Sequence, residues 1–170
     1  WRGGLGREVM VGVDAALVLP WDPETGRVLL VEQVRAGPAR RGDPNPWTLE
    51  PVAGIIDPGE TPEAAARRET AEEAGLSLDA IVPMFSGYPT PGNATDHFHC
   101  FLGFADLSRG VLRYGGLDAE DEDLRLHVLG LDEALDLVES GEVTVVPLAM
   151  MLLWLDRARR QGRAERPAAP

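Results

Sequence analysis

The sequence lacks several features that would indicate a special location or partner. Cys100 is the only cysteine among 170 residues, so no internal disulfide can form, and we expect a reducing, cytoplasmic location. The apolar run over residues 147–155 is too short to span a bilayer, and no signal-peptide pattern opens the chain. The net charge of -12 argues against a general nucleic-acid binder or an anionic-membrane binder. It remains compatible with a small phosphorylated substrate, provided that metal ions neutralise the site.

The length and the pattern of elements predict one folded unit. We expect a single domain over residues 1–161, with a hydrophobic fraction of 44% that is ordinary for a globular protein, and a frayed tail over 162–170. The chain opens at Trp1 rather than Met, which leaves open an N-terminal truncation. Strand-like and helix-like segments mix without regular alternation. We therefore expect an α/β or α+β fold with a mixed sheet flanked by helices.

Periodicity and turn residues place the individual elements. Proline and glycine predict a turn over 21–26 and a surface loop over 36–46. The expected strands and extended pieces are 9–20, 27–35, 47–57, 81–89, 97–105 and 124–131, and the expected helices are 62–74, 132–141 and 147–161.

The helix expected over 62–74 has clear signals at both ends. Thr61 is a good N-cap residue, and Pro62 suits the first helical position, where its missing N–H costs nothing. Gly75 suits a left-handed C-terminal cap. The local sequence alone therefore fixes where this helix begins and ends.

The same helix carries a cluster of acidic residues. Glu69, Glu72 and Glu73 share one helix face because positions i, i+3 and i+4 are neighbours. A solvated acidic face, partly neutralised by Arg67 and Arg68, is one interpretation. The other is a site for a hard divalent cation such as Mg2+, which a few carboxylates hold together with substrate phosphates.

A fixed frame around the cluster favours the second interpretation. Reading from Gly54, the frame continues through Glu60 and ends at Leu76, and it contains Arg68-Glu69, Glu72-Glu73 and Gly75. This frame resembles the Nudix box, the signature of hydrolases that act on nucleoside diphosphates linked to another group. Thr70 takes a place that is usually aliphatic, a mild departure. The resemblance implies the Nudix fold, an αβα sandwich with a mixed central sheet.

The resemblance also implies roles for the residues of the box. Glu69 and Glu73 would be the principal metal ligands, and Glu72 a further ligand or a catalytic helper. Glu60 would be an outer ligand or a partner for Arg68, and Arg68 would orient the carboxylates. The metal shell would be completed by the carbonyl of Ala53. The expected ion is Mg2+, with Mn2+ as a substitute.

Residues outside the box resemble the ADP-ribose pyrophosphatase branch of the family. Pro91 lies sixteen residues beyond Gly75 and is followed by Gly92, although an ordinary turn is the alternative. Asp96 stands where that branch usually has Glu. The resemblance would aim Arg35 at the substrate phosphates, and it adds to the substrate-binding candidates Arg7, Trp47 and Glu50.

An acidic loop near residues 113–124 completes the expected site. By resemblance, Glu120 would act as the general base and Glu122 as an extra metal ligand, although the choice between the two is open. On composition alone, the loop could equally be a solvated surface segment. His97 and His99 share one strand face and could bind metal, but we favour a structural role.

The resemblance implies an activity and an assembly. We expect Mg2+-dependent hydrolysis of ADP-ribose to AMP and ribose 5-phosphate by a homodimer. Enzymes of this branch commonly exchange an N-terminal segment between subunits, but little precedes Arg7 here, so we expect that segment to be truncated, disordered or absent. One alternative is a Nudix pyrophosphatase for other nucleotide sugars, dinucleotides or polyphosphates. Another is a non-catalytic ligand-sensing Nudix module.

Overall fold

The computed structural model describes residues 6–108, 114–116 and 123–167. Eight strands are present in these ranges: β1 (Asp14–Asp22), β2 (Arg27–Val34), β3 (Trp47–Glu50), β4 (Val52–Ile55), β5 (Ala80–Gly87), β6 (His97–Phe104), β7 (Tyr114–Gly115) and β8 (Leu124–Gly130). The helices of these ranges are α1 (Ala36–Arg41), α2 (Pro62–Ala74), α3 (Leu131–Glu139) and α4 (Val146–Arg160).

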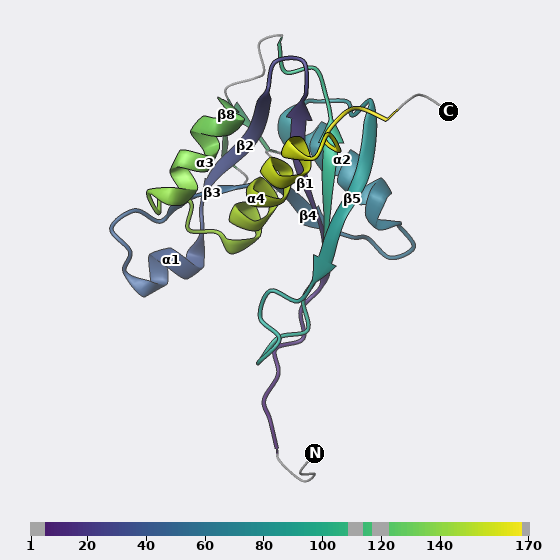
Figure 1. The fold of residues 1–170 in the computed structure, drawn as a ribbon. Helices are drawn as coiled ribbons and strands as arrows, with labels where there is room; N and C mark the ends of the chain where they lie inside the picture. The colour runs from purple at the N-terminus through teal and green to yellow at the C-terminus, as the bar shows by residue number, and fades with distance from the viewer. Residues whose placement is uncertain (1–5, 109–113, 117–122, 168–170) are drawn as a thin grey trace.

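The strands form one mixed sheet in the order β5-β6-β1-β2-β8-β7, with β3 paired to β2 and β4 paired to β1. The pairing of β1 with β6 is parallel, whereas the other strand pairs are antiparallel. Helices α3 and α4 cover one face of this sheet and α2 covers the other (Figure 1). The expected αβα sandwich with a mixed central sheet is therefore confirmed.

Two separate cores hold the layers together. Under α3 and α4, large side chains such as Leu19, Phe104 and Leu152 are fully buried. Under α2, the helix contributes mainly alanine, so Ala65 and Ala66 pack directly on the sheet. Because alternate residues of a strand face opposite sides, one sheet supplies both cores.

The structure corrects two expected boundaries near the N-terminus. The strand expected over 9–20 begins only at Asp14, because residues 6–13 leave the sheet and run beside the 88–96 segment. Met10 forms an isolated bridge with Ala94 there. The expected loop over 36–46 also contains the short helix α1, which ends at Gly42 with a positive φ of 87°. The proline of this helix lies in its first turn, where the missing N–H of proline is tolerated. A proline at this position therefore does not exclude a helix.

The C-terminal segment also differs from the frayed tail that we expected over 162–170. Ala164 is 5% exposed, and its carbonyl accepts a hydrogen bond of 3.0 Å from the Trp21 indole. Arg166 forms an ion pair with Asp79 at 2.8 Å. Residues 168–170 lie outside the described ranges. The main chain therefore stays attached to the sheet beyond α4, through contacts that no local pattern shows.

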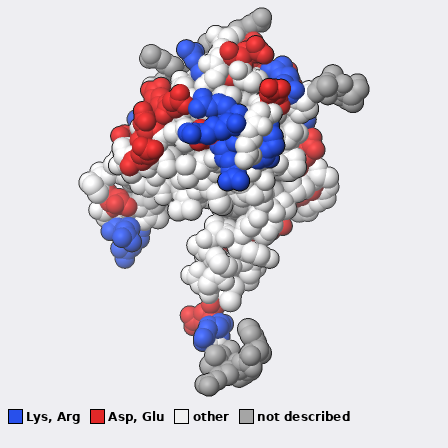
Figure 2. Space-filling model, viewed as in Figure 1, with Lys and Arg blue, Asp and Glu red and all other residues white. Residues whose placement is uncertain are grey.

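Residues 6–13 and the 88–96 segment together project from the body of the molecule (Figure 1). We call this pair of segments the arm. Much of its surface carries no charge in Figure 2, and its exposed large side chains are Val9, Met10, Val11, Val13 and Tyr88. In the described part of the chain, no helix has the length and apolar character needed to cross a membrane.

Candidate active site

Helix α2 has the bounds that the sequence predicts. The Thr61 hydroxyl accepts a hydrogen bond of 3.2 Å from the Ala64 N–H, and Pro62 is the first helical residue. Gly75 adopts the left-handed conformation with a φ of 64°, and its N–H donates to the Ala71 carbonyl. Both ends of the helix are thus capped by local hydrogen bonds.

Arg68 is the centre of the carboxylate cluster on α2. Its Nη1 donates to Glu69 at 2.6 Å and to Glu72 at 3.0 Å. Its Nε and Nη2 donate to the two oxygens of Glu60, at 3.1 and 3.0 Å. Nη2 also donates to the Ile55 carbonyl at 3.0 Å. One guanidinium therefore holds three carboxylates and the end of β4 in a fixed arrangement, and Glu60 takes the role of a partner for Arg68.

The ionisation of this cluster follows from its hydrogen bonds. The hydrogen bonds that Arg68 donates to Glu60, and those that it donates to Glu69 and Glu72, raise the pKa of Arg68. The hydrogen bond from Arg68 lowers the pKa of Glu60 below its usual value. Each shift favours the charged form of its own group, so the ion pair between Arg68 and Glu60 persists near neutral pH.

Glu73 lies apart from the Arg68 cluster and points toward the sheet. The residue is 3% exposed, and its carboxylate accepts a hydrogen bond of 3.4 Å from the Ala53 N–H. The neighbouring Gly54 lies under Glu69: a Cβ atom at this position would lie 1.9 Å from the Glu69 carboxylate. The glycine of the frame is thus explained, because any side chain there would displace an acidic group of the cluster.

Thr70 departs from the usual box but fits its position. It is fully buried, and its hydroxyl donates to the Ala66 carbonyl at 2.7 Å. The hydroxyl is therefore satisfied within the helix, as buried polar groups generally are.

The donor set suits a divalent cation, although the described residues contain no preformed group of three or more metal-ligating side chains. Glu60, Glu69, Glu72 and Glu73 bring four negative charges against the single positive charge of Arg68, which leaves three negative charges in excess. Hard ions such as Mg2+ prefer carboxylate and carbonyl oxygens and complete their shells with water and substrate phosphates. Such an ion therefore needs only a few of its ligands from protein side chains.

The cluster opens into a cleft of about 660 Å3. Five of the candidate residues line it together: Arg35, Glu50, Ala53, Arg68 and Glu69. Arg35 directly follows β2, Glu50 ends β3, Ala53 lies in β4, and the other two belong to α2. The sequence reasoning missed the apolar wall of the cleft, which is formed by Pro89, Phe98, Val145 and Pro147. Pro89 lies two residues from the expected Pro91, whereas the wall residues at the start of α4 carry no motif that could have found them.

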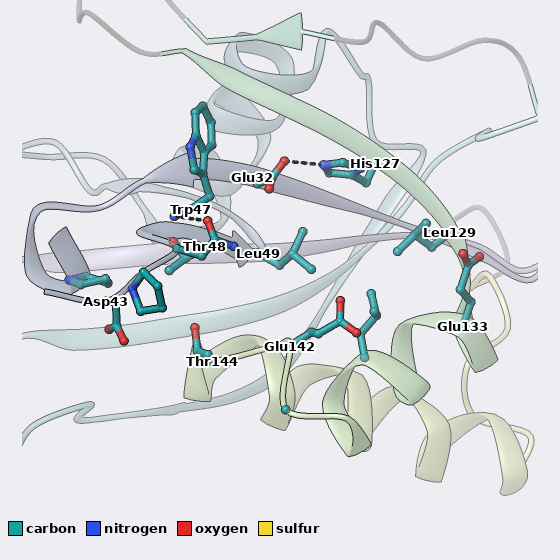
Figure 3. Close-up of a pocket in the computed structure, with 15 residues that line it drawn as sticks. Glu32, Asp43, Trp47, Thr48, Leu49, His127, Leu129, Glu133, Glu142 and Thr144 are labelled. Atoms are coloured by element: carbon teal, nitrogen blue, oxygen red, sulfur yellow. Dashed lines mark hydrogen bonds and ion pairs between the residues drawn. The ribbon is translucent and has the colours of Figure 1, made fainter.

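The remaining substrate candidates lie elsewhere in the structure. Trp47 lines a second cavity of about 520 Å3, shown in Figure 3, where Glu32 also pairs with His127 at 3.0 Å. The guanidinium carbon of Arg125 lies 3.8 Å from the Trp47 ring centroid, a cation–π contact. Trp47 therefore does not line the cleft that contains the box residues.

Four further candidates belong to the arm. Arg7, Pro91 and Gly92 are exposed there, and Asp96 accepts a hydrogen bond of 3.4 Å from the Val13 N–H. A Cβ atom at Gly12 would lie 2.0 Å from Asp96, so the two segments of the arm are in close contact. None of the four lines the cleft that contains the box residues. Glu120 and Glu122 lie outside the described residues.

His97 and His99 occupy neighbouring positions on one face of β6, as the sequence predicts. The Nδ1 of His97 lies 3.3 Å from the Nε2 of His99, and Tyr88 packs edge-on against His97. One nitrogen of each imidazole ring therefore has its hydrogen-bond partner in the other ring.

The family model of the NUDIX domain matches residues 12–148, and the chain belongs to the Nudix family. It is 37% identical over 149 residues to the ADP-ribose pyrophosphatase of Escherichia coli (strain K12), covering 88% of this chain and 70% of the relative. The resemblance to the ADP-ribose pyrophosphatase branch is thereby confirmed. Nudix enzymes of this branch generally depend on a divalent metal.

Two further comparisons bear on fold and specificity. A GDP-mannose pyrophosphatase of Citrobacter koseri is 31% identical over 149 residues, covering 88% of this chain and 76% of the relative. A solved structure titled "Crystal structure of ADP compounds hydrolase" superimposes with a TM-score of 0.69 at 20% identity, covering 88% of this chain and 75% of that chain. The latter likeness supports the fold alone.

Proposed function

We propose that this protein hydrolyses the diphosphate bond of ADP-ribose to AMP and ribose 5-phosphate with bound Mg2+, for which Mn2+ can substitute. The observation that carries the proposal is the acidic cluster of α2, which opens into a cleft whose wall also presents Arg35. A diphosphate is strongly anionic and cannot approach the cluster unless cations lie between them. The likeness to ADP-ribose pyrophosphatases favours ADP-ribose among diphosphate substrates.

Glu69 and Glu73, with the Ala53 carbonyl, would hold the metal, and Glu72, Glu60 and Glu122 would support it. A bound divalent ion polarises phosphoryl oxygens and lowers the pKa of a water molecule. Arg68 holds Glu69 and Glu72 together, because its Nη1 binds both carboxylates, and of these two Glu69 lines the cleft.

The reaction also needs a base and a group that holds the substrate. Arg35, which lines the same cleft as Arg68 and Glu69, would bind the diphosphate. We assign the removal of the proton from the attacking water to Glu120, which carries the base role in the family resemblance.

The position of the arm supports a homodimer. Val9, Val11 and Val13 are 52%, 86% and 48% exposed, an uncommon amount of apolar surface on a projecting segment. In a dimer, the arm residues Arg7, Pro91, Gly92 and Asp96 would reach the cleft of the second copy, and Glu50 would support the cleft of its own copy. Trp47 would contact substrate only from the second cavity. Size-exclusion chromatography with light scattering should give twice the mass of one chain. A mass of one chain at all concentrations would rule out the dimer.

The substrate is tested by incubating the purified protein with ADP-ribose and Mg2+. AMP and ribose 5-phosphate should form in equal amounts, and chelation of the metal should stop the reaction. Absence of AMP at every pH between about 7 and 9 would refute the proposed activity, since a metal-activated water should be available in this range.

GDP-mannose hydrolysis is the second candidate function, because the chain is also similar to a GDP-mannose pyrophosphatase. The preference between two substrates is measured by the ratio of their kcat/KM values. These values should therefore be measured for ADP-ribose, GDP-mannose and dinucleotides. Tight binding of ADP-ribose in a calorimetric titration, without turnover of any substrate, would instead support a ligand-sensing module.

The extent of the domain and its location stay proposals. We propose one Nudix domain over residues 1–161 and a cytoplasmic location, which suits the single buried thiol of Cys100. Fractionation of source cells tests the location.

A further inference from the structure

The carboxylate of Glu50, in the wall of the cleft, accepts three hydrogen bonds from side chains. Glu50 is 6% exposed and ends β3. Its Oε2 accepts a hydrogen bond of 2.6 Å from Nη2 of Arg35. Its Oε1 accepts one of 2.8 Å from Nε of Arg35 and a second of 2.6 Å from the hydroxyl of Thr48. The arginine therefore binds the carboxylate through two nitrogens, and the Thr48 hydroxyl donates to Oε1, the oxygen that also accepts from Nε of Arg35.

Thr48 meets Glu50 because residues two apart on a strand face the same side. Thr48 is 4% exposed, so its hydroxyl is shielded from water. A hydroxyl donates one proton, and two acceptors lie within reach: Glu50 at 2.6 Å and the Gln33 carbonyl at 3.4 Å. The shorter contact, to a charged acceptor, is the stronger one.

The hydrogen bonds to Glu50 set the orientation of the Arg35 side chain. Its side chain is 47% exposed and belongs to the wall of the cleft that also contains Glu69 and Arg68. A guanidinium is planar, so fixing Nε and Nη2 on one carboxylate also fixes the direction of Nη1. A rotation of Glu50 would turn the whole arginine head.

We infer that Thr48 is a positioning residue for substrate binding, acting through Glu50 on Arg35. The hydroxyl of Thr48 locks the rotamer of Glu50, and Glu50 in turn holds Arg35 in the orientation that receives the diphosphate. This inference rests on the proposed function, since it takes Arg35 as the group that binds the diphosphate. A small buried hydroxyl thus sets the affinity of the cleft for a substrate that it never touches.

The test compares two substitutions that remove either the hydroxyl or the methyl group of Thr48. Thr48→Val removes the hydroxyl and keeps the shape, whereas Thr48→Ser keeps the hydroxyl. For ADP-ribose with Mg2+, Thr48→Val should raise KM about three- to tenfold and change kcat less than about twofold, because the arginine binds ground state and transition state alike. Thr48→Ser should stay within about twofold of the wild type in both constants. Thr144→Val, at an exposed threonine outside the cleft, is the matched control and should leave both constants unchanged.

A second measurement separates positioning from loss of packing. In an Arg35→Gln background, Thr48→Val should have no further effect on KM, because coupled residues give non-additive effects. An additive rise of KM in the double variant would overturn the inference. A lowered kcat with unchanged KM in Thr48→Val would overturn it as well.

Binding of ADP in the presence of Mg2+ tests the inference without turnover. Calorimetry should show a three- to tenfold larger Kd for Thr48→Val than for the wild type and the Ser variant, in line with a lost hydrogen bond to a charged group. If the wild type binds ADP with this difference but does not hydrolyse ADP-ribose, the proposed function fails and the positioning role stands. Equal Kd values for wild type and Thr48→Val, or no binding of ADP by the wild type, refute the positioning role.

Discussion

The two faces of the central sheet are covered by helices of opposite character. Helix α2 buries only small or polar side chains, namely Ala65, Ala66, Thr70, Glu73 and Ala74. Helix α4, on the other face, buries Leu148, Met151, Leu152, Leu155 and Ala158. The alanines let α2 lie so close to the sheet that Glu73 reaches the backbone of Ala53. Large side chains would hold the carboxylates away from β4.

The α2 face therefore carries the acidic groups of the site, whereas the α4 face contributes more to the stability of the fold. The apolar area that a helix buries sets how strongly it holds the fold together, and the area under α4 is larger per residue. The face under α2 contributes less hydrophobic stabilisation, but its small side chains allow a close contact between an acidic group and the backbone. Substitutions on the two faces should therefore have different consequences, and matched pairs can test the division.

The largest expected effect is on activity and comes from the α2 face. Glu73→Gln removes a buried negative charge from the proposed metal site, and kcat/KM should fall by about a thousandfold, since a bound metal contributes several kcal/mol and each tenfold change corresponds to about 1.4 kcal/mol. Glu63→Gln on the exposed side of the same helix is the control and should retain activity. Steady-state kinetics with unfolding curves provide the measurement; full turnover in Glu73→Gln would exclude Glu73 from the metal site.

The next effect is on stability and comes from the opposite face. Leu152→Ala should lower the free energy of unfolding by about 2–5 kcal/mol, because it leaves a cavity in a fully buried position. Its neighbour Leu153 is 55% exposed, so Leu153→Ala should change stability by less than about 0.5 kcal/mol. Urea denaturation measures both. Similar losses in the two variants would show that α4 does not pack as described.

The close approach of α2 can be tested by enlarging one alanine. Ala66 is fully buried against the sheet, so Ala66→Leu should cost about 1–3 kcal/mol of stability through overpacking. It should also reduce activity, because the carboxylates would move away from β4. Ala64→Leu, at an exposed position of the same helix, should do neither. An Ala66→Leu variant of wild-type stability and activity would refute the tight spacing.

The smallest effect concerns a buried acidic group that serves the fold rather than the cleft. Burial raises the pKa of Asp22, but hydrogen bonds from Thr25, Leu107 and Glu24 outweigh it and leave the pKa below its usual value. Asp22 therefore stabilises the folded state above about pH 4, and this contribution is lost as the pH falls through the lowered pKa.

Asp22→Asn should consequently destabilise the protein by about 1–2 kcal/mol at pH 7, where the charged acceptor is lost. The difference from the wild type should shrink in unfolding curves recorded near pH 3. A difference that stays constant from pH 7 to pH 3 would show that Asp22 has the same pKa in the folded and unfolded chains.

The box helix was predictable because its signals are local. Thr61, Pro62 and Gly75 fix its ends through hydrogen bonds within a few residues, and the 3.6-residue repeat places the glutamates on one side. The sequence did not separate them further. In the structure, Arg68 holds Glu69 and Glu72, whereas Glu73 turns under the helix to β4. That split depends on how close the sheet lies.

Other misses share one cause. Trp47 stacks with Arg125, a residue of another strand, rather than entering the cleft. The tail packs through Ala164 on Trp21, a residue 143 positions away. Each outcome depends on a partner distant in sequence, so a local pattern could not have revealed it.

The sequence by itself determined the family, the bounds of α2 and the identity of its acidic groups, because spacing along a helix and capping are properties of short segments. Only the tertiary structure decided which carboxylates Arg68 holds, that Arg35 meets Glu50 and Thr48, and which surfaces form the cleft. Those relations depend on strand register and on the distance between layers. Both are set by the packing of the whole chain.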